Sequence, residues 1–160
     1  MRLDRNELYM SMAHLMSLRG TCKRKQVGAI IVQEGRIISC GYNGAAPELP
    51  HCLEHGCDIN RACNHAYHAE QNALLWAIGN QININKSVLY VTTSPCIKCA
   101  ELIIQLKNVG QSMIEVVYSE EYREKEGLLL LERNGIRTIK YQDARNFYSQ
   151  IQNCKHNKGS

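Results

Sequence analysis

The chain has 160 residues, of which 44% are hydrophobic and 21% are charged, so it can bury one sizeable core but hardly two. No stretch approaches the ~18 to 20 consecutive apolar residues of a membrane span, the amino terminus is charged where a secretory signal would be apolar, and a net charge of +4 is too small to indicate a nucleic-acid-binding surface. We therefore expect a single domain over residues 1–160, in a soluble protein of the cytoplasm, or of the host cytoplasm if the source is viral.

The first part of the chain predicts a helix followed by a hairpin. Within residues 3–18, apolar side chains recur at helical spacing, which predicts a helix with these side chains on one face: Leu8, Met12, Leu15 and Met16. Residues 26–32 and 36–41 are short β-branched runs separated by Glu34-Gly35, and they predict two strands. Residues 44–67 show no periodicity and contain two of the three prolines, so they predict a loop that something other than a core must order.

From residue 69 onward, helical and strand patterns alternate. Helices are predicted over residues 69–78, 96–107 and 121–133, and strands over residues 87–92, 113–118 and 136–141. This alternation predicts an α/β fold in which helices cover a shared sheet. The polar residues 155–160 are expected to be frayed.

Two short motifs carry the strongest chemical signal. His68-Ala69-Glu70 precedes one predicted helix, and Pro95-Cys96-Ile97-Lys98-Cys99 follows an apolar strand. Because proline favours the first positions of a helix, both cysteines are expected in a first turn, where residues three apart share a face and the helix dipole favours the thiolate. The motifs therefore predict two thiolates and an imidazole where two helices begin.

This combination predicts a catalytic zinc site. His68, Cys96 and Cys99 would be three ligands that leave the fourth tetrahedral position open for water, whose pKa zinc lowers toward ~7. Glu70 is not a ligand in this pattern and is predicted to carry protons between that water, a ring nitrogen and the leaving ammonia. A His-x-Glu motif with Pro-Cys-x-x-Cys is the signature of zinc nucleobase deaminases. A Cys-x-x-Cys alone would equally indicate a redox or structural zinc motif.

The sequence resembles the deoxycytidylate (dCMP) deaminases, in particular their bacterial and phage branch, from about residue 5 to residue 141. The resemblance is carried by Gly41-Tyr42-Asn43-Gly44, His68-Ala69-Glu70-Gln71-Asn72-Ala73, Ser94-Pro95-Cys96-x-x-Cys99 and Tyr118-x-x-x-Tyr122. It implies a three-layer α/β/α cytidine-deaminase-like fold with a central mixed five-stranded sheet. It also implies zinc-dependent hydrolysis of dCMP to dUMP, which supplies thymidylate synthesis.

The resemblance further implies how the substrate is bound. Asn43 would recognise the sugar, because its amide both donates and accepts hydrogen bonds. Arg24 is a better candidate for the 5′-phosphate than Lys25, because a guanidinium binds phosphate in a bidentate way. The other candidates for substrate binding are Ala69, Ser94, Tyr118 and Tyr122. For the tyrosines the alternative is packing in the core or at a sheet edge, and for the basic cluster it is a solvated turn.

Regulation is also implied by the resemblance. Members of the family are usually hexamers, activated by dCTP together with Mg²⁺ and inhibited by dTTP, at a site between subunits to which Gly41, Tyr42 and Gly44 would contribute. In this chain the segment continues as Ala45-Ala46-Pro47-Glu48, whereas many members place a proline and a glycine sooner. This departure bears on whether the same effectors act here.

Four cysteines outside the catalytic motifs predict a second, structural zinc. A closed four-ligand zinc would order the irregular stretch, and the spacing is similar to that of the second zinc in bacterial and phage dCMP deaminases. The predicted ligands are Cys22, Cys52, Cys57 and Cys63, with His65 as a substitute for one of them. The alternative is that some are buried small apolar residues, as we expect for Cys40 and Cys154.

Two other classes of function remain open. Deaminases of a free nucleoside, or of a base in tRNA or single-stranded DNA, use the same zinc chemistry. Polynucleotide substrates favour a basic surface and stacking aromatic residues, whereas this chain has one Trp and one Phe, so a free nucleotide is favoured and no nucleic-acid partner is expected. A non-catalytic zinc-binding module would not need Glu70 beside its ligands. A riboflavin-pathway deaminase or a guanine deaminase would not be expected to combine Gly41-Tyr42-Asn43-Gly44 with the cysteine-containing loop.

Overall fold

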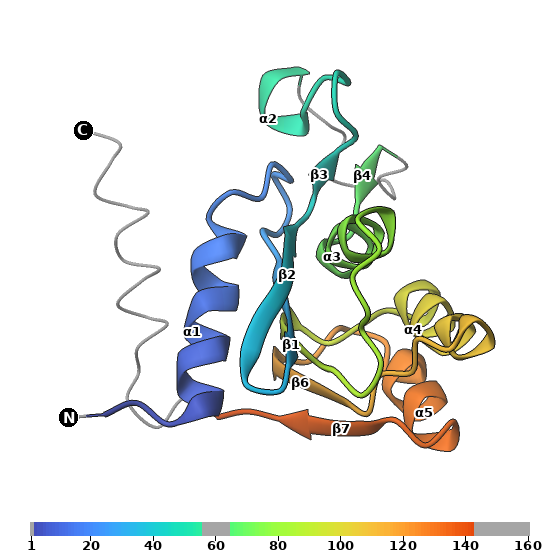
Figure 1. Cartoon of the computed structure of the whole chain (residues 1–160). Coiled ribbons are helices and arrows are strands. Elements are labelled where there is room, and N and C mark those ends of the chain that lie inside the picture. The colour runs from blue at the N-terminus through green and yellow to red at the C-terminus, as the bar shows by residue number, and fades with distance from the viewer. Residues whose placement is uncertain (1, 56–64, 143–160) are drawn as a thin grey trace.

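The computed structural model describes residues 2–55 and 65–142 (Figure 1). Its helices are α1 (Arg5–Ser17), α2 (Cys52–His55), α3 (Ala69–Gly79), α4 (Ile97–Gln105) and α5 (Glu126–Arg133), with a 3₁₀ turn η1 (Leu106–Val109) after α4. Its strands are β1 (Gly28–Gln33), β2 (Arg36–Tyr42), β3 (Gly44–Ala45), β4 (Ala66–Tyr67), β5 (Val88–Thr93), β6 (Glu115–Glu120) and β7 (Arg137–Lys140). Every helix and strand predicted from periodicity is present, with boundaries shifted by a few residues.

Five strands form a mixed sheet in the order β2-β1-β5-β6-β7. β1 runs antiparallel to both β2 and β5, whereas β5, β6 and β7 are parallel to one another. The parallel half follows from the βαβ connections through α4 and α5, which return each strand in the same direction. The mixed five-stranded sheet expected from the family resemblance is confirmed.

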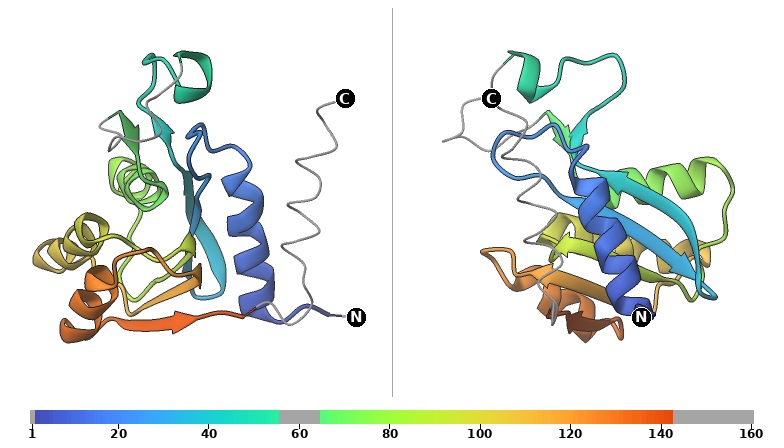
Figure 2. Two further views of the ribbon diagram at one scale, coloured as in Figure 1. Left: turned by 180° about the vertical axis from the view of Figure 1, so that it is seen from behind. Right: turned by 90° about the vertical axis from the view of Figure 1, so that its left-hand side faces the viewer.

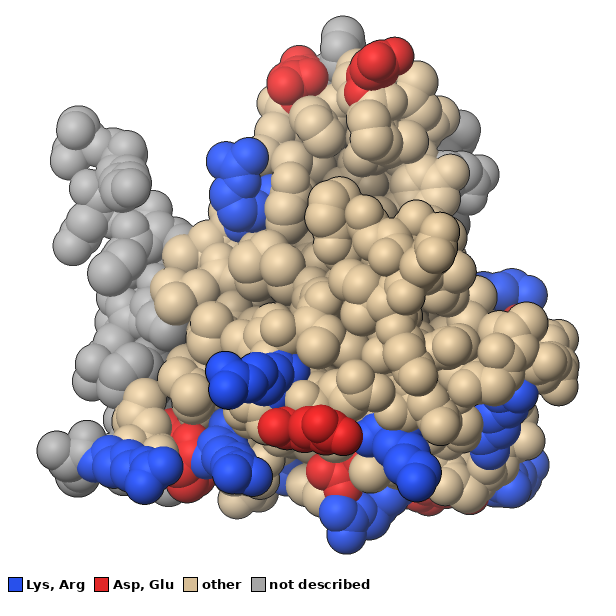
Figure 3. All heavy atoms as spheres, viewed as in Figure 1, with Lys and Arg blue, Asp and Glu red and all other residues tan. Residues whose placement is uncertain are grey.

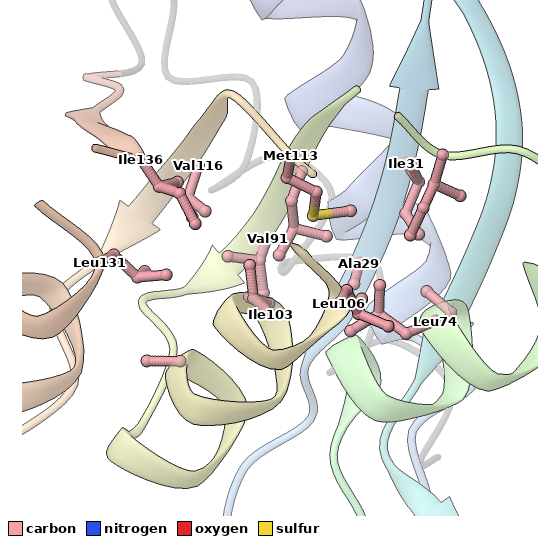
Figure 4. Packing of buried hydrophobic residues seen from close by; sticks show 14 of the residues in the cluster. Ala29, Ile31, Leu74, Val91, Ile103, Leu106, Met113, Val116, Leu131 and Ile136 are labelled. Atoms are coloured by element: carbon pink, nitrogen blue, oxygen red, sulfur yellow. The ribbon is translucent and has the colours of Figure 1, made fainter. Parts of the chain in front are cut away.

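Helices cover both faces of this sheet in three layers, as the resemblance implied (Figures 1 and 2). On one face, α1 packs Met10 and Ala13 against Ile30 and Val117. On the other face, side chains of α3, α4 and α5 pack against β1, β5 and β6, as Figure 4 shows for Leu74, Ile103, Leu131 and neighbouring residues. The fully buried apolar side chains on both faces are the main source of stability.

The face that α1 buries differs from the one its apolar spacing indicated. Leu8, Met12 and Leu15 are exposed to 40%, 36% and 52%, whereas Met10 and Ala13 are fully buried and polar His14 and Ser17 lie nearly so. Gly28 at the start of β1 lets the helix lie close to the sheet, because a Cβ atom there would be 2.0 Å from the carbonyl oxygen of Ala13 and 2.5 Å from the backbone nitrogen of Ser17. That tertiary contact decides the orientation of α1. Cys40 was also expected to be buried, but it is exposed because β2 is the edge strand. Cys154 lies outside the described residues.

A short ribbon not expected from the sequence closes the irregular stretch. β3 pairs antiparallel with β4, so that Gly44 lies opposite Tyr67 and Ala45 opposite Ala66. Both ends of the predicted loop over residues 44–67 are therefore held together next to the start of α3. The ribbon positions the segment that leads into His68.

The surface shows no segregation of charge on the face drawn in Figure 3. Lys and Arg side chains alternate there with Asp and Glu along the end of the molecule formed by β7 and α5. None of the helices in the described part of the chain combines the length and apolar character that a membrane crossing requires.

Candidate active site

The two predicted motifs meet at the starts of α3 and α4. His68 is the N-cap of α3, in extended conformation at φ −76° and ψ 156°, and Glu70 lies in the first turn of that helix. Cys96 is the N-cap of α4, at φ −69° and ψ 170°, and Cys99 lies one turn into it. The sequence predicts Pro95 at the first position of the helix, with both cysteines in the first turn. In the structure Pro95 lies before the N-cap, Cys96 is the N-cap itself, and Cys99 lies in the first turn.

The three predicted zinc ligands are in contact. The Sγ atoms of Cys96 and Cys99 lie 3.5 Å and 3.4 Å from Nδ1 of His68, and all three atoms are within 4.8 Å of one another. With Zn–S near 2.3 Å and Zn–N near 2.0 to 2.1 Å, tetrahedral angles require sulfur and nitrogen to be about 3.5 Å apart. Two thiols and an imidazole at this spacing fit a zinc ion with one further coordination position.

The two thiols differ in acidity. The hydrogen bond from Cys99, reinforced by His68, lowers the pKa of Cys96 to about 3. The same hydrogen bond to Cys96, together with burial, raises the pKa of Cys99. Cys96 is therefore a thiolate at neutral pH, which is the form that binds a metal ion.

Glu70 is buried beside these ligands, with 3% of its surface exposed. Burial raises the pKa of its carboxyl to about 7, against the smaller lowering effects of a backbone hydrogen bond and of the nearby His68. A carboxyl that changes protonation near neutral pH has the property required of a general acid and base.

A pocket of about 500 Å³ opens above the cluster, a volume within the usual range for small-molecule sites. It lies at the carboxyl ends of the parallel strands β5 and β6, where open α/β sheets commonly bind ligands. Besides His68, Glu70 and Cys96, its wall includes six of the seven residues predicted to bind substrate: Arg24, Lys25, Asn43, Ala69, Ser94 and Tyr122. Residues from five separate segments of the chain thus converge on one site.

Tyr118 is the predicted substrate residue that does not reach this wall. It lies within β6, is 7% exposed, and belongs to the hydrophobic core on the side of α3, α4 and α5. Lys25 reaches the wall, but its Nζ also lies 2.7 Å from Glu120 at the end of β6, which offsets part of its charge. Ser94 is buried, and its Oγ accepts a hydrogen bond from the backbone N–H of Tyr122 at 2.7 Å.

Five further residues line the pocket without having been identified from the sequence: Val27, Ala66, Thr93, Glu121 and Arg123. Thr93 ends β5, while Glu121 and Arg123 follow β6. The guanidinium of Arg123 lies 5.7 Å from the centroid of the Tyr122 ring. The positions of Thr93, Glu121 and Arg123 at the ends of parallel strands are the signal that could have identified these three.

The residues predicted for an effector site have structural roles next to α3. A Cβ atom on Gly41 would lie 2.4 Å from the carbonyl oxygen of Ala69 and 2.6 Å from the backbone nitrogen of Ala73, so only glycine permits this approach. The carbonyl of Tyr42 accepts a hydrogen bond from Asn72, and Gly44 pairs within the β3–β4 ribbon. These contacts tie β2 to the first turns of α3, where Glu70 lies.

The predicted second metal site is partly described. Cys22 and Cys52 are both buried, at 9% and 8% exposure, and Cys22 also lines the pocket. Cys57 and Cys63 lie outside the described residues, and His65 is exposed. The second zinc therefore stays a prediction.

Comparison with known proteins points to one family. Residues 3–116 match the model of the cytidine and deoxycytidylate deaminase zinc-binding region. The chain is 38% identical over 123 residues to ComE operon protein 2 of Bacillus subtilis, an alignment covering 76% of this chain and 62% of that protein. It is 35% identical over 147 residues to the deoxycytidylate deaminase of Saccharomyces cerevisiae, covering 85% and 44%. The chain thus spans less than two thirds of either relative.

The fold of this chain matches a solved structure over nearly the whole length of the solved chain. That structure is the crystal structure of the dCMP deaminase from cyanophage S-TIM5 in complex with dCMP and dUMP. The TM-score is 0.78 and the identity 34%, with 88% of this chain and 99% of that chain covered.

Proposed function

This chain belongs to the cytidine and deoxycytidylate deaminase family, and we propose that it is a zinc-dependent dCMP deaminase that converts dCMP to dUMP and ammonia, supplying thymidylate synthesis. The observation that carries the proposal is the meeting of His68, Cys96 and Cys99 with the buried Glu70 at the base of a pocket. The cyanophage enzyme, at 34% identity, supports the choice of substrate. The basic side chains of Arg24, Lys25 and Arg123 in the pocket wall support a nucleotide over a nucleoside.

Glu70 would move the protons of this hydrolysis. His68, Cys96 and Cys99 would hold a zinc ion, which when bound supplies a Lewis acid that makes water a better nucleophile. Glu70 accepts a proton from the attacking water and delivers it to the ring nitrogen N3, while the water oxygen bonds to C4. It then carries the proton of the new C4 hydroxyl to the amino group, so that the C4–N4 bond breaks, ammonia leaves and the C4 carbonyl of dUMP forms. Its burial in the first turn of α3 keeps the carboxyl in one position.

Arg24 is the residue that we propose for the 5′-phosphate. It lines the pocket, its side chain is exposed to the solvent, and its guanidinium suits a phosphate with two parallel hydrogen bonds. Arg123 stands on the same pocket wall and would add positive charge. Lys25 contributes less, because Glu120 already neutralises part of its charge.

The number of metal ions, the regulation and the assembly are proposed from the family resemblance. We propose a second zinc held by Cys22, Cys52, Cys57 and Cys63, and the burial of Cys22 and Cys52 supports it. Metal analysis of fully loaded protein should then give more than one zinc per chain, and a value of one would exclude the second zinc.

The thiols of Cys40, Cys96 and Cys99 are not in disulfides, which supports a reducing, cytoplasmic location.

We further propose a hexamer that dCTP with Mg²⁺ activates and dTTP inhibits. The exposed apolar side chains of Leu75 and Trp76 on α3, at 56% and 61% exposure, support subunit contacts. Sedimentation should give about six times the 18.2 kDa chain mass. A monomer at micromolar concentration would exclude this assembly.

The function is tested by ammonia release from zinc-loaded protein. We expect turnover of dCMP, much slower turnover of deoxycytidine, and a further increase in dCMP turnover with dCTP and Mg²⁺. Equal turnover of the two substrates would exclude the phosphate-binding role. Turnover of neither substrate would indicate a polynucleotide substrate or a non-catalytic zinc module.

A further inference from the structure

Asn43 joins two segments of the pocket wall through four hydrogen bonds. Its backbone carbonyl accepts from the N–H of Thr21 at 2.9 Å, and its backbone N–H donates to the carbonyl of Val27 at 3.1 Å. Its side chain also accepts one hydrogen bond and donates one: Oδ1 accepts from the N–H of Val27 at 2.8 Å, and Nδ2 donates to the carbonyl of Lys25 at 2.7 Å. The residue is 8% exposed, so these bonds are largely shielded from water.

The segment that Asn43 holds, residues 20–27, carries pocket residues but belongs to no helix or strand. Cys22, Arg24, Lys25 and Val27 all line the pocket. A loop without secondary structure must satisfy its backbone groups elsewhere, and here the amide of Asn43 binds the backbone on the carboxyl side of Arg24. The direction in which the chain presents Arg24 therefore depends on this amide.

We propose that Asn43 is a positioning residue that sets the preference for a phosphorylated substrate, by fixing the backbone that carries Arg24. The inference rests on the proposed function, because it takes Arg24 as the phosphate ligand. The side chain of Asn43 uses one amide hydrogen and one lone pair on the protein itself, which distinguishes this role from recognition of the sugar alone.

A double-mutant cycle tests the proposal. We would measure kcat/KM for dCMP and for deoxycytidine in the wild type, Asn43→Ala, Arg24→Ala and the double variant. Since removing the amide displaces a charge-assisted phosphate contact, Asn43→Ala should lower kcat/KM for dCMP by about 10- to 100-fold and that for deoxycytidine by less than about 3-fold. The double variant should resemble Arg24→Ala alone, because both changes remove the same contact.

Equal losses for the two substrates, with effects that multiply in the double variant, would instead indicate direct sugar recognition and overturn the proposal. If the wild type does not prefer dCMP over deoxycytidine, the proposed function fails first, and this outcome is distinct because it needs no variant.

Two further variants act on the same amide. Gly20→Ala would place a Cβ atom 2.5 Å from Oδ1 of Asn43, although Gly20 is not among the residues that line the pocket. It should reproduce the dCMP-specific loss, and unchanged dCMP selectivity would contradict the proposal. Asn43→Asp keeps an acceptor for Val27 but replaces the donor to Lys25 with a second acceptor, so it should also show a dCMP-specific loss if Asn43→Ala does not fold.

Asn72→Ala is the matched control. Asn72 also donates an amide hydrogen bond to a backbone carbonyl, that of Tyr42 at 2.7 Å, but it does not bind residues 20–27 and does not line the pocket. It should lower stability while leaving the ratio of dCMP to deoxycytidine activity unchanged. A dCMP-specific loss in Asn72→Ala would show that general destabilisation, not the position of Arg24, produces the effect.

Discussion

Burying the carboxyl of Glu70 costs free energy, because a carboxylate leaves water for the protein interior. The fold places it beside two thiols and an imidazole, where it adds nothing to a hydrophobic core. Ionisable groups in such strongly perturbing surroundings are concentrated at functional sites. At the scale of single residues, the burial of Glu70 is therefore explained by its chemistry rather than by packing.

Replacing Glu70 with Gln should separate catalysis from metal binding. The amide keeps the shape of the side chain but cannot carry a proton, so kcat should fall by about 10²- to 10⁴-fold while the zinc content is unchanged. Steady-state assays and metal analysis on the same preparation measure both. The control Glu115→Gln alters a carboxyl 9% exposed that pairs with Arg137 outside the pocket, and should keep kcat near the wild-type value. Retained turnover in zinc-replete Glu70→Gln would contradict the assignment.

Cys96→Ser should lose the catalytic zinc and the activity together. A serine hydroxyl remains protonated at neutral pH and is a much poorer zinc ligand than the thiolate that Cys96 provides. Zinc per chain and ammonia release should both fall relative to the wild type. Cys40→Ser changes an exposed cysteine that is not part of the metal cluster found among the described residues, and should alter neither quantity. An active, zinc-loaded Cys96→Ser protein would mean that another residue binds the metal.

At the scale of secondary-structure elements, the site is the meeting point of two helix starts. α3 brings His68 and Glu70, α4 brings Cys96 and Cys99, and the backbone between β1 and α1 brings Arg24. Each helix is held against the sheet by its own buried residues, so the relative position of the two starts depends on packing. A small shift of either helix would separate the ligands.

Gly41→Ala should disturb α3 and thereby the zinc site, although its nearest neighbours are Ala69 and Ala73 and not the three ligands. Its new Cβ atom would collide with the backbone of Ala69 and Ala73 and push the first turn away from β2. We expect lower zinc affinity, lower kcat and lower thermal stability. Gly79→Ala, at the other end of the same helix with open space around it, should leave activity unchanged and stabilise slightly. Calorimetry and zinc titration of the two variants provide the comparison, and wild-type behaviour of Gly41→Ala would contradict the packing argument.

At the scale of the whole molecule, a sheet with helices on both faces forms the rigid base of the pocket (Figure 2). The core on the side of α3, α4 and α5 extends across β1, β5 and β6, and so connects the elements that carry the ligands. Truncating a side chain in this core should therefore lower global stability more than it changes the chemistry of the site.

Leu131→Ala should destabilise the protein by about 2 to 5 kcal/mol, because it leaves a cavity among fully buried residues of α5 and the sheet. Leu129→Ala removes the same atoms from a side chain of α5 that is 50% exposed, and should change stability by less than about 0.5 kcal/mol. Denaturant unfolding measures both. Similar midpoints for the two variants would contradict the burial pattern of α5.

The local sequence determined the elements and the zinc cluster. Periodicity identified each main helix and strand, and the motif spacing identified His68, Glu70, Cys96 and Cys99, because helix starts and first turns are set by neighbouring residues. The family resemblance then supplied most of the pocket wall.

Only the tertiary structure decided which face of α1 is buried and which residues far apart in the chain meet at the pocket. The apolar spacing of α1 indicated the face of Leu8 and Leu15, but the sheet binds the opposite face through Met10 and Ala13. Arg123 enters the pocket, Tyr118 does not, and Asn43 binds backbone groups up to 22 residues before it in the chain. Such contacts depend on how separate segments pack in space, and a local pattern does not encode the distance between residues far apart in the chain.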